Sequence, residues 1–525
     1  MSRNRTSPLS IIVMTTLLSA CQSTMSIEEA KKVTTQFAGS PFVPPPRTIE
    51  DISAILDQQK RADPRAAETA RARADQSPPE TTDASVLTKF YYERGLAARE
   101  IGRAKQEIED LSKALSYAGS NHEILFELSM AELQGGTYSR SIDYRRKAIA
   151  AVPWNQRGWL IGLNSGLAMM YASWGDLQAA EAALAETLRV FSESQSWQNP
   201  RPEWIAGYRA SVAQGRAAIL EAKGQYAEAE AFYRQAAAAL ASDAVRSKQP
   251  WLDQQHSFIA RTLIHQGRLL EAENEARKAL LGALTKRGRY ANHTAWMLRS
   301  LVWVIQEQGR YREAETLARA VVDIYEKTGS SSDSLFLAGV RGQLATALQF
   351  QRRYREALEQ YEAIRAGLSG DPEYLNKFLG GHMGYAVALL RTGKPDQALE
   401  ILDGALAKSR RLVGDRHRNT AQIRAYMAQA YAAKDDRLRA LQEFREAIPV
   451  LLSGSFEGND EATTRIAADL RLAGILTGYI ELLADITGTG LERETGIDAA
   501  AEAFRLAEVV RGRSVERALD ASAAR

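Results

Sequence analysis

From about residue 85 onward, the apolar and polar positions of the chain follow a pattern that returns at nearly constant spacing. Residues 91–115 read YYERGLAAREIGRAKQEIEDLSKAL, which predicts two helices joined by a turn centred on Gly102. Equivalent turns centre on eight further residues: Gly136, Gly175, Gly224, Gly267, Gly309, Arg352, Gly393 and Asp435. The first spacing is 34 residues, and the last five lie between 41 and 43 residues. The pattern therefore predicts an array of helix pairs.

Small side chains stand at fixed distances from these turns. Seven residues before the turn, eight of the nine units have Gly, Ser or Ala, and Val302 is the exception. Five residues after the turn, eight units again have Ser or Ala, and Glu107 is the exception. Larger side chains would overpack the points where paired helices cross. A generic helical bundle would not keep this spacing, so the units are expected to share one packing geometry.

Helix pairs with this period resemble tetratricopeptide (TPR) repeats, and the longer spacing is similar to that of kinesin light chains and related bacterial arrays. A single pair cannot bury its apolar face, so neighbouring pairs must stack. We expect an all-α TPR-type solenoid, a right-handed superhelix of antiparallel helix pairs, with about nine repeats over residues 85–455. One such array accounts for a 525-residue chain that length alone would divide into three or four domains.

The first 21 residues, MSRNRTSPLSIIVMTTLLSAC, have the layout of an export signal. Arg3 and Arg5 precede an apolar stretch, Leu9 to Leu18, which is too short to span a bilayer. Small residues then lead to Cys21, and this sequence resembles a bacterial lipobox. The alternative is an ordinary secretory signal with a cysteine there by chance.

The lipobox resemblance implies that residues 1–20 are a lipoprotein signal peptide and that acylated Cys21 inserts into a lipid bilayer, since two acyl chains anchor a protein stably. The residue after the cysteine is Gln22 rather than Asp, which favours the outer membrane. The expected location is therefore the bacterial outer membrane, at its periplasmic face. Eight of the 15 prolines lie in the first 84 residues, so residues 21–84 are expected to be a Pro-rich tether, with one short helix from Thr48 to Leu56.

The C-terminal part carries a more specific resemblance. Residues 497–518, IDAAAEAFRLAEVVRGRSVERA, follow an AIPVLLS segment and are similar to the last repeat of bacterial TPR–CHAT proteins. In that family a TPR array precedes a CHAT domain, which has a caspase-like cysteine protease fold. The resemblance covers residues 44–525 and implies that residues 456–525 form a C-terminal helical repeat leading into a CHAT domain.

A CHAT protease needs a histidine and a cysteine nucleophile in an α/β domain that follows the array. The sequence ends at Arg525, and its only cysteine is Cys21, so no catalytic residue can be assigned by the resemblance. Two interpretations stay open: the sequence is a fragment of a protease, or the protein is an array-only relative.

Composition and motifs give no support for catalysis or nucleic-acid binding. The chain has 67 Lys and Arg against 64 Asp and Glu, and so small a surplus of positive charge predicts no nucleic-acid partner. Phosphate-binding loops, dinucleotide fingerprints and hydrolase or zinc motifs are absent. The six histidines show no metal-ligand spacing. We therefore expect no enzyme activity, no metal and no cofactor.

TPR arrays usually bind peptides on a concave face that is built by the first helix of each repeat. The spacing from the turns places six candidate residues on that face: Arg261, His265, Trp296, Arg299, Trp303 and Gln306. Trp and Arg are enriched at binding hot spots, and Arg can bind a carboxylate with two hydrogen bonds. We expect an acidic or C-terminal peptide between the arginines and the tryptophans. The alternative is that the tryptophans fill the core and the arginines face solvent.

The sequence as a whole predicts a membrane-anchored TPR scaffold that binds a protein or peptide partner on its concave face. One alternative is the recruitment or regulatory part of a TPR–CHAT cysteine protease whose catalytic domain lies outside this chain. A weaker alternative is a cytosolic TPR regulator whose start codon is assigned wrongly.

Overall fold

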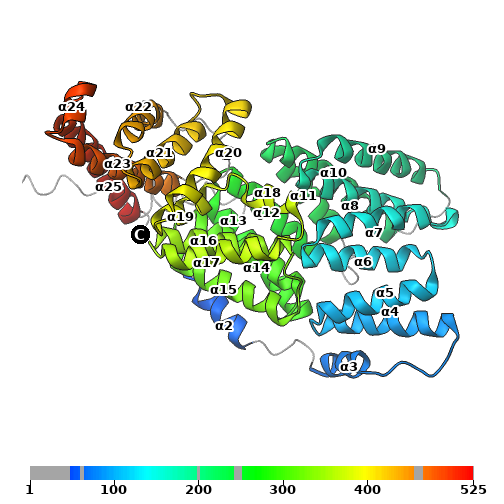
Figure 1. Ribbon diagram of the computed structural model, residues 1–525. Coiled ribbons are helices and arrows are strands. Elements are labelled where there is room, and N and C mark those ends of the chain that lie inside the picture. The colour runs from blue at the N-terminus through cyan, green and yellow to red at the C-terminus, as the bar shows by residue number, and fades with distance from the viewer. Residues whose placement is uncertain (1–47, 59–63, 198–201, 242–250, 454–464, 524–525) are drawn as a thin grey trace, which may run out of the picture. The chain divides into compact units, whose positions relative to one another are not determined.

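The computed structural model describes residues 48–58, 64–197, 202–241, 251–453 and 465–523 (Figure 1). The chain divides into two compact units, Met1–Pro45 and Pro46–Arg525, and all described residues belong to the second. The expected signal peptide and Cys21 lie outside the described residues. The described residues form α-helices and one short 3-10 helix, Trp154–Gln156, without any strand. This confirms the all-α part of the expectation.

The helices of the array follow one another as antiparallel pairs in which each helix packs on its partner. The pairs are α4 (Ala84–Glu100) with α5 (Ala104–Ala118), α6 (His122–Gly135) with α7 (Tyr138–Ala151), α8 (Trp159–Trp174) with α9 (Leu177–Ser194), α10 (Pro202–Ala222) with α11 (Tyr226–Ala241), α12 (Leu252–His265) with α13 (Leu269–Arg287), α14 (Asn292–Glu307) with α15 (Tyr311–Lys327), α16 (Leu335–Phe350) with α17 (Tyr354–Gly367), α19 (Met383–Arg391) with α20 (Pro395–Val413), and α21 (Arg418–Ala433) with α22 (Arg437–Ser453).

The turn residues that the sequence singles out lie between the two helices of these pairs, and all have positive φ. Seven are glycines, the residue that adopts this conformation without steric cost. The other two, Arg352 and Asp435, both have φ of 62° and are the only non-glycine residues with positive φ in the described parts of the chain. The backbone thus keeps the same turn even where the sequence has lost its glycine.

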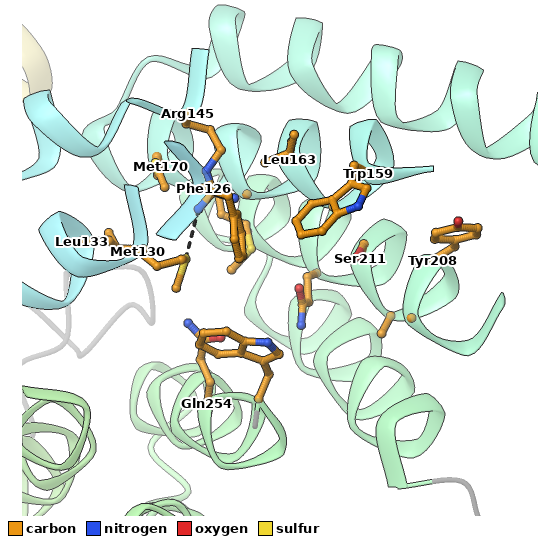
Figure 2. Close-up of a pocket in the computed structure, with 18 of the residues that line it drawn as sticks. Phe126, Met130, Leu133, Arg145, Trp159, Leu163, Met170, Tyr208, Ser211 and Gln254 are labelled. Atoms are coloured by element: carbon orange, nitrogen blue, oxygen red, sulfur yellow. Dashed lines mark hydrogen bonds between the residues drawn. The ribbon is translucent and has the colours of Figure 1, made fainter. Parts of the chain in front are cut away.

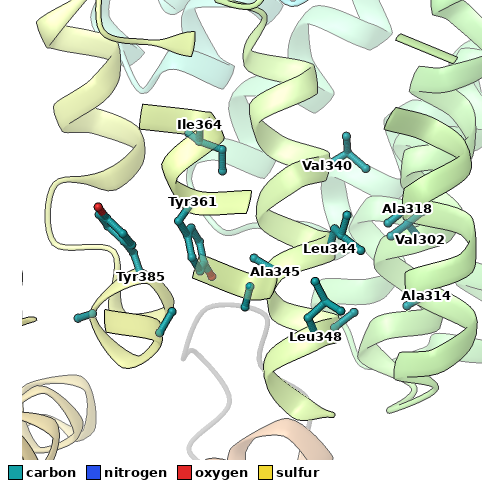
Figure 3. Packing of buried hydrophobic residues seen from close by; sticks show 14 of the residues in the cluster. Val302, Ala314, Ala318, Val340, Leu344, Ala345, Leu348, Tyr361, Ile364 and Tyr385 are labelled. Carbon is teal, nitrogen blue, oxygen red and sulfur yellow. The ribbon is translucent and has the colours of Figure 1, made fainter. Parts of the chain in front are cut away.

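The small residues around the turns pack as the crossing of two helices requires. Ala314 and Ala345 are fully buried, and Figure 3 shows them among the larger side chains of neighbouring helices. Val302, the exception before the turns, is also fully buried. Glu107, the exception after the turns, is 6% exposed, and its Oε1 accepts from Arg99 Nε at 2.7 Å. The ion pair explains how the first pair accommodates a carboxylate at a crossing point.

The N-terminal segment of the described chain differs from the expected tether. It contains two helices, α2 (Glu50–Gln58) and α3 (Pro64–Ala74), rather than one. The apolar face of α2 packs into the main core, the large cluster of buried apolar side chains that extends from Ala217 on α10 to Leu506 in the C-terminal part of the chain. Ile52 is 1% exposed there. Arg277 on α13 holds the helix in place, because it pairs with Asp51 at 2.6 Å. Residues 48–58 are therefore docked on the array, which the proline count could not reveal.

The first two pairs also contact loops that lie far along the chain. Helix α6 packs against α14 and α16, and Figure 1 shows α6 and α14 next to each other. The Leu335 amide donates to the Gly136 carbonyl at 2.9 Å, and the Ala104 amide donates to the Thr328 carbonyl at 3.1 Å. We call these two backbone hydrogen bonds the return contact. They join the turns of the first two pairs to the loop that follows α15 and to the first residue of α16.

A short helix, α18 (Pro372–Leu379), stands between α17 and α19 and extends this contact. Its Tyr374 hydroxyl accepts from the Ser139 amide at 2.7 Å, and Lys377 Nζ lies 3.3 Å from the centre of the Trp174 ring. The sequence pattern did not reveal this helix.

The C-terminal described segment consists of α23 (Arg465–Ile486), α24 (Gly490–Thr495) and α25 (Ala499–Ala523). Helices α23 and α25 pack on each other, and Leu506 is fully buried in the main core. Within the described residues, no helix combines the length and apolar character that crossing a membrane would need.

Candidate functional site: a cavity lined by arginine and aromatic residues

A cavity of about 1160 Å³ lies among α6, α7, α8, α10, α11, α12 and α14 (Figure 2). None of the described side chains that line it is acidic. Four of them are arginines: Arg145, Arg157, Arg261 and Arg299. Eleven others are aromatic: Phe126, Tyr138, Trp154, Trp159, Trp197, Trp204, Tyr208, Tyr233, Trp251, Phe258 and Trp296. The wall is therefore apolar and positively charged.

Arg145 on α7 is a buried cation whose hydrogen bonds go to neutral atoms. It is 3% exposed, and its Nε donates to Ser129 Oγ at 3.0 Å. Its Nη2 donates to Met130 Sδ at 3.0 Å, the bond drawn between the two residues in Figure 2. Its guanidinium stacks 4.9 Å from the centre of the Phe126 ring. Burial lowers the pKa of Arg145 to about 10, while Glu127 acts in the opposite direction, so the group is still charged at neutral pH.

Arg299 on α14 is the second cavity arginine that forms no ion pair with a described carboxylate. Its guanidinium carbon lies 4.6 Å from the centre of the Phe336 ring. Burial is the main cause that lowers its pKa. Gly339 makes room for it, because a Cβ at that position would lie 2.7 Å from Arg299 Nη1.

Arg261 and Arg157 differ from these two because carboxylates partly neutralise them. Arg261 forms two hydrogen bonds with the Glu221 carboxylate, of which the Nη2–Oε2 bond measures 2.7 Å. Burial alone would lower the pKa of Arg261, but the charge and hydrogen bonds of Glu221 raise it. Arg157 lies 3.9 Å from Glu193 and stacks 4.3 Å from the centre of the Trp154 ring.

The aromatic wall divides into a packed part and an exposed part. Trp296 is 7% exposed and stacks on Phe336 with ring centres 5.4 Å apart. It therefore supports the core as well as lining the cavity. In contrast, Trp154 is 80% exposed and Trp204 is 50% exposed. Large aromatic rings at a cavity wall that are exposed to this extent can cover an incoming ligand.

The six residues selected from the sequence separate into two groups. Arg261, Trp296 and Arg299 line the cavity, whereas His265, Trp303 and Gln306 do not. The residues of the second group pack elsewhere. His265 stacks on Tyr226 with ring centres 4.2 Å apart, and Trp303 Nε1 donates to Glu307 Oε1 at 3.2 Å. Gln306 is 9% exposed. Burial also lowers the pKa of His265. These three residues are therefore not assigned to the candidate site.

Sequence reasoning missed Arg145 and the cavity tryptophans other than Trp296. All eight tryptophans lie between residues 154 and 303, and this clustering could have indicated that several of them line one site. Arg145 was missed because the concave face was assigned to first helices, and α7 is the second helix of its pair. No group of three His, Cys, Asp or Glu residues suited to a metal ion occurs in the described residues.

Comparisons with known proteins identify the repeats. The family model of the tetratricopeptide repeat matches residues 255–327 and 380–453. Among solved structures, kinesin light chain TPR-like repeats from Podosopora anserina share 20% identity at a TM-score of 0.32, covering 39% of this chain and 96% of that one.

Two further structures cover more of the chain. A Rap protein complexed with competence and sporulation factor is 13% identical with a TM-score of 0.39, covering 82% of this chain and 98% of that one. The apo form of RapI is 11% identical with a TM-score of 0.43, covering 75% and 98%. No curated protein sequence matches the chain. With the family match and the observed helix pairs, the chain is an all-α solenoid that carries TPR repeats.

Proposed function

We propose that the chain is a scaffold that holds an acidic peptide segment of a protein partner in the cavity, with the aromatic side chains of the wall covering its apolar parts. The observation that carries this proposal is the composition of the wall, with four arginines, eleven aromatic side chains and no carboxylate among the described lining residues. TPR repeats are protein-interaction modules in general. A cavity near 1160 Å³ exceeds the roughly 300–1,000 Å³ of ordinary small-molecule pockets, which favours a peptide of several residues.

The anionic part of the peptide is assigned to Arg299 because this arginine has no carboxylate partner among the described residues. Arg261 contributes less than the sequence suggested, since Glu221 already neutralises it. Trp154 supplies exposed ring surface. Such a site combines the two residue types that dominate binding hot spots, which favours a scaffold role over catalysis.

The test uses the full chain and random octapeptides with fluorescein at the N-terminus, made as an acidic pool and as a basic pool. We expect fluorescence polarisation to show tighter binding of the acidic pool. The Arg299→Gln variant should lose at least tenfold in affinity for it, since a charge-assisted contact contributes about 1.5–3 kcal/mol. Arg312→Gln, at an exposed position on α15, is the matched control and should bind normally. Equal binding of both pools would refute the proposal.

We also propose that the scaffold is anchored to the outer membrane through acylated Cys21. The support is the order of charge, apolar stretch, small residues and cysteine in residues 1–21. Replacing Cys21 with Ser and fractionating cells tests this point separately. The variant is expected in the soluble fraction, and unchanged membrane retention would contradict the anchor.

A second candidate is the recruitment part of a TPR–CHAT protease. The similarity of residues 497–518 to the last repeat of that family supports it. The DNA that follows codon 525 provides the test: an open frame that encodes a histidine and a cysteine in an α/β domain would favour the protease, and a native stop codon would refute it.

A further inference from the structure

We infer that Arg145 is a second anion-binding point of the cavity and that it receives a carboxylate of the bound peptide. This inference rests on the proposed peptide-binding function. It adds a residue from a second helix, α7, to a site that the TPR pattern assigns to first helices. The carboxylate can belong to an acidic side chain or to the C-terminus of the peptide, and peptides with free or amidated ends distinguish these sources.

The first support is that Arg145 is buried while no described carboxylate neutralises its charge. The side chain is 3% exposed and lines the cavity, yet no described carboxylate pairs with it. Glu127, the one acidic group that acts on it electrostatically, is already paired with Arg99 at 2.7 Å. Burying an uncompensated charge is costly, so an incoming carboxylate would gain a strong interaction there.

The second support is the room that Gly166 leaves for the guanidinium at the cavity wall. Gly166 on α8 faces Arg145, and a Cβ at this position would lie 2.9 Å from Arg145 Nη1. Both residues line the cavity. A glycine inside a helix lowers stability by about 1 kcal/mol relative to alanine. Gly166 is explained by its contact with Arg145, because a side chain at this position would push the guanidinium aside.

The third support is the position of Arg145 relative to Arg299. Arg145 lies on α7 and Arg299 on α14, and both line the same cavity. Because the two arginines reach the wall from different helices and neither pairs with a described carboxylate, the expected ligand is a peptide with two carboxylates.

The experiment uses the full chain and four pools of random octapeptides labelled with fluorescein at the N-terminus. The pools combine a free or amidated C-terminus with acidic residues or their amide counterparts. Arg145→Gln should lower affinity for the fully acidic pool by at least tenfold. Arg146→Gln, at the exposed neighbouring position on α7, should leave it unchanged. If Arg145→Gln affects only pools with a free C-terminus, the terminal carboxylate is the source; if it affects only pools with acidic residues, a side chain is.

A second variant separates binding from a structural role of Arg145 between α6 and α7. Gly166→Ala keeps the arginine and favours the helix, but it displaces the guanidinium, so we expect a several-fold loss of affinity without a lower melting temperature. If wild type binds the acidic pool and neither variant changes the affinity, the inference is wrong and the proposed function stands. If wild type binds no pool, the proposed function and this inference fail together.

Discussion

Gly136 and Leu335 are 199 residues apart in the chain, and their backbones share a hydrogen bond of 2.9 Å from the Leu335 amide to the Gly136 carbonyl. Gly136 forms the turn between α6 and α7 with φ of 85°. It also leaves room for the approaching chain, because a Cβ there would lie 2.5 Å from the Phe336 amide nitrogen. This glycine therefore serves both a local turn and the return contact.

The first prediction separates these two roles by comparing equivalent turns. Gly175 has φ of 89°, and a Cβ added there would meet no atom within 4 Å. Gly175→Ala should therefore lower the free energy of unfolding only by the cost of placing alanine in the left-handed conformation, about 1–2 kcal/mol. Gly136→Ala adds a collision with backbone and should cost at least about 1 kcal/mol more. Urea unfolding measures both. Hydrogen exchange should show faster exchange of the Leu335 amide in Gly136→Ala alone, and equal effects of the two variants would contradict the importance of the return contact.

The second prediction concerns the Glu221 carboxylate beside the cavity. Glu221→Gln leaves Arg261 without its charge partner, and breaking such a pair where the carboxylate is 11% exposed should cost about 3 kcal/mol. Glu181→Gln, which breaks an exposed pair with Lys223, is the control and should cost less than about 1 kcal/mol. Chemical denaturation gives both values.

The same substitution has an opposite effect on the proposed site. With Glu221 neutralised, Arg261 becomes a third uncompensated cation in the cavity wall. Acidic octapeptides should bind Glu221→Gln more tightly than wild type at a temperature where both are folded. Weaker or unchanged binding would mean that Arg261 does not face the ligand.

The third prediction follows from the environment of His265. Burial lowers its pKa below the value of 6.5 that it has in the unfolded chain, and the nearby Arg261 acts in the same direction against Glu221. The unfolded state therefore binds the proton more readily, and the free energy of unfolding should fall as the pH drops through 6.5 toward the folded pKa. His265→Phe keeps an aromatic ring for stacking on Tyr226 and should show a smaller loss between about pH 7.5 and pH 5.5. An identical loss in both proteins would exclude this contribution.

The repeat turns and the small crossing residues could be predicted from the sequence because they depend on local geometry that each unit must satisfy. The return contact could not. Gly102 and Gly136 look like every other turn glycine in the sequence, and only the folded chain brings Tyr290 and Phe336 against them. Arg145 was missed for a different reason, because the repeat pattern assigned the binding face to first helices and α7 is the second helix of its pair. Contacts between distant segments leave no periodic signal.

The last prediction tests how α2 is held on the array. Ile52 is 1% exposed in the main core, and truncating such a side chain costs about 2–5 kcal/mol. A nine-residue helix has little stability of its own, so Ile52→Ala should release α2 rather than unfold the repeats. Limited proteolysis should then cleave residues 48–58 faster, while the melting temperature of the array changes little.

The neighbouring Ile55 provides the matched control, because it is only partly buried against the same core. Ile55→Ala should increase cleavage much less. Arg277 should retain its pair with Glu273 at 2.8 Å after α2 is released, so the surface under the helix stays compensated and the array stays folded. If Ile52→Ala lowers the melting temperature as strongly as a core substitution in the repeats, such as Leu301→Ala, α2 is an integral part of the array and not a separable segment.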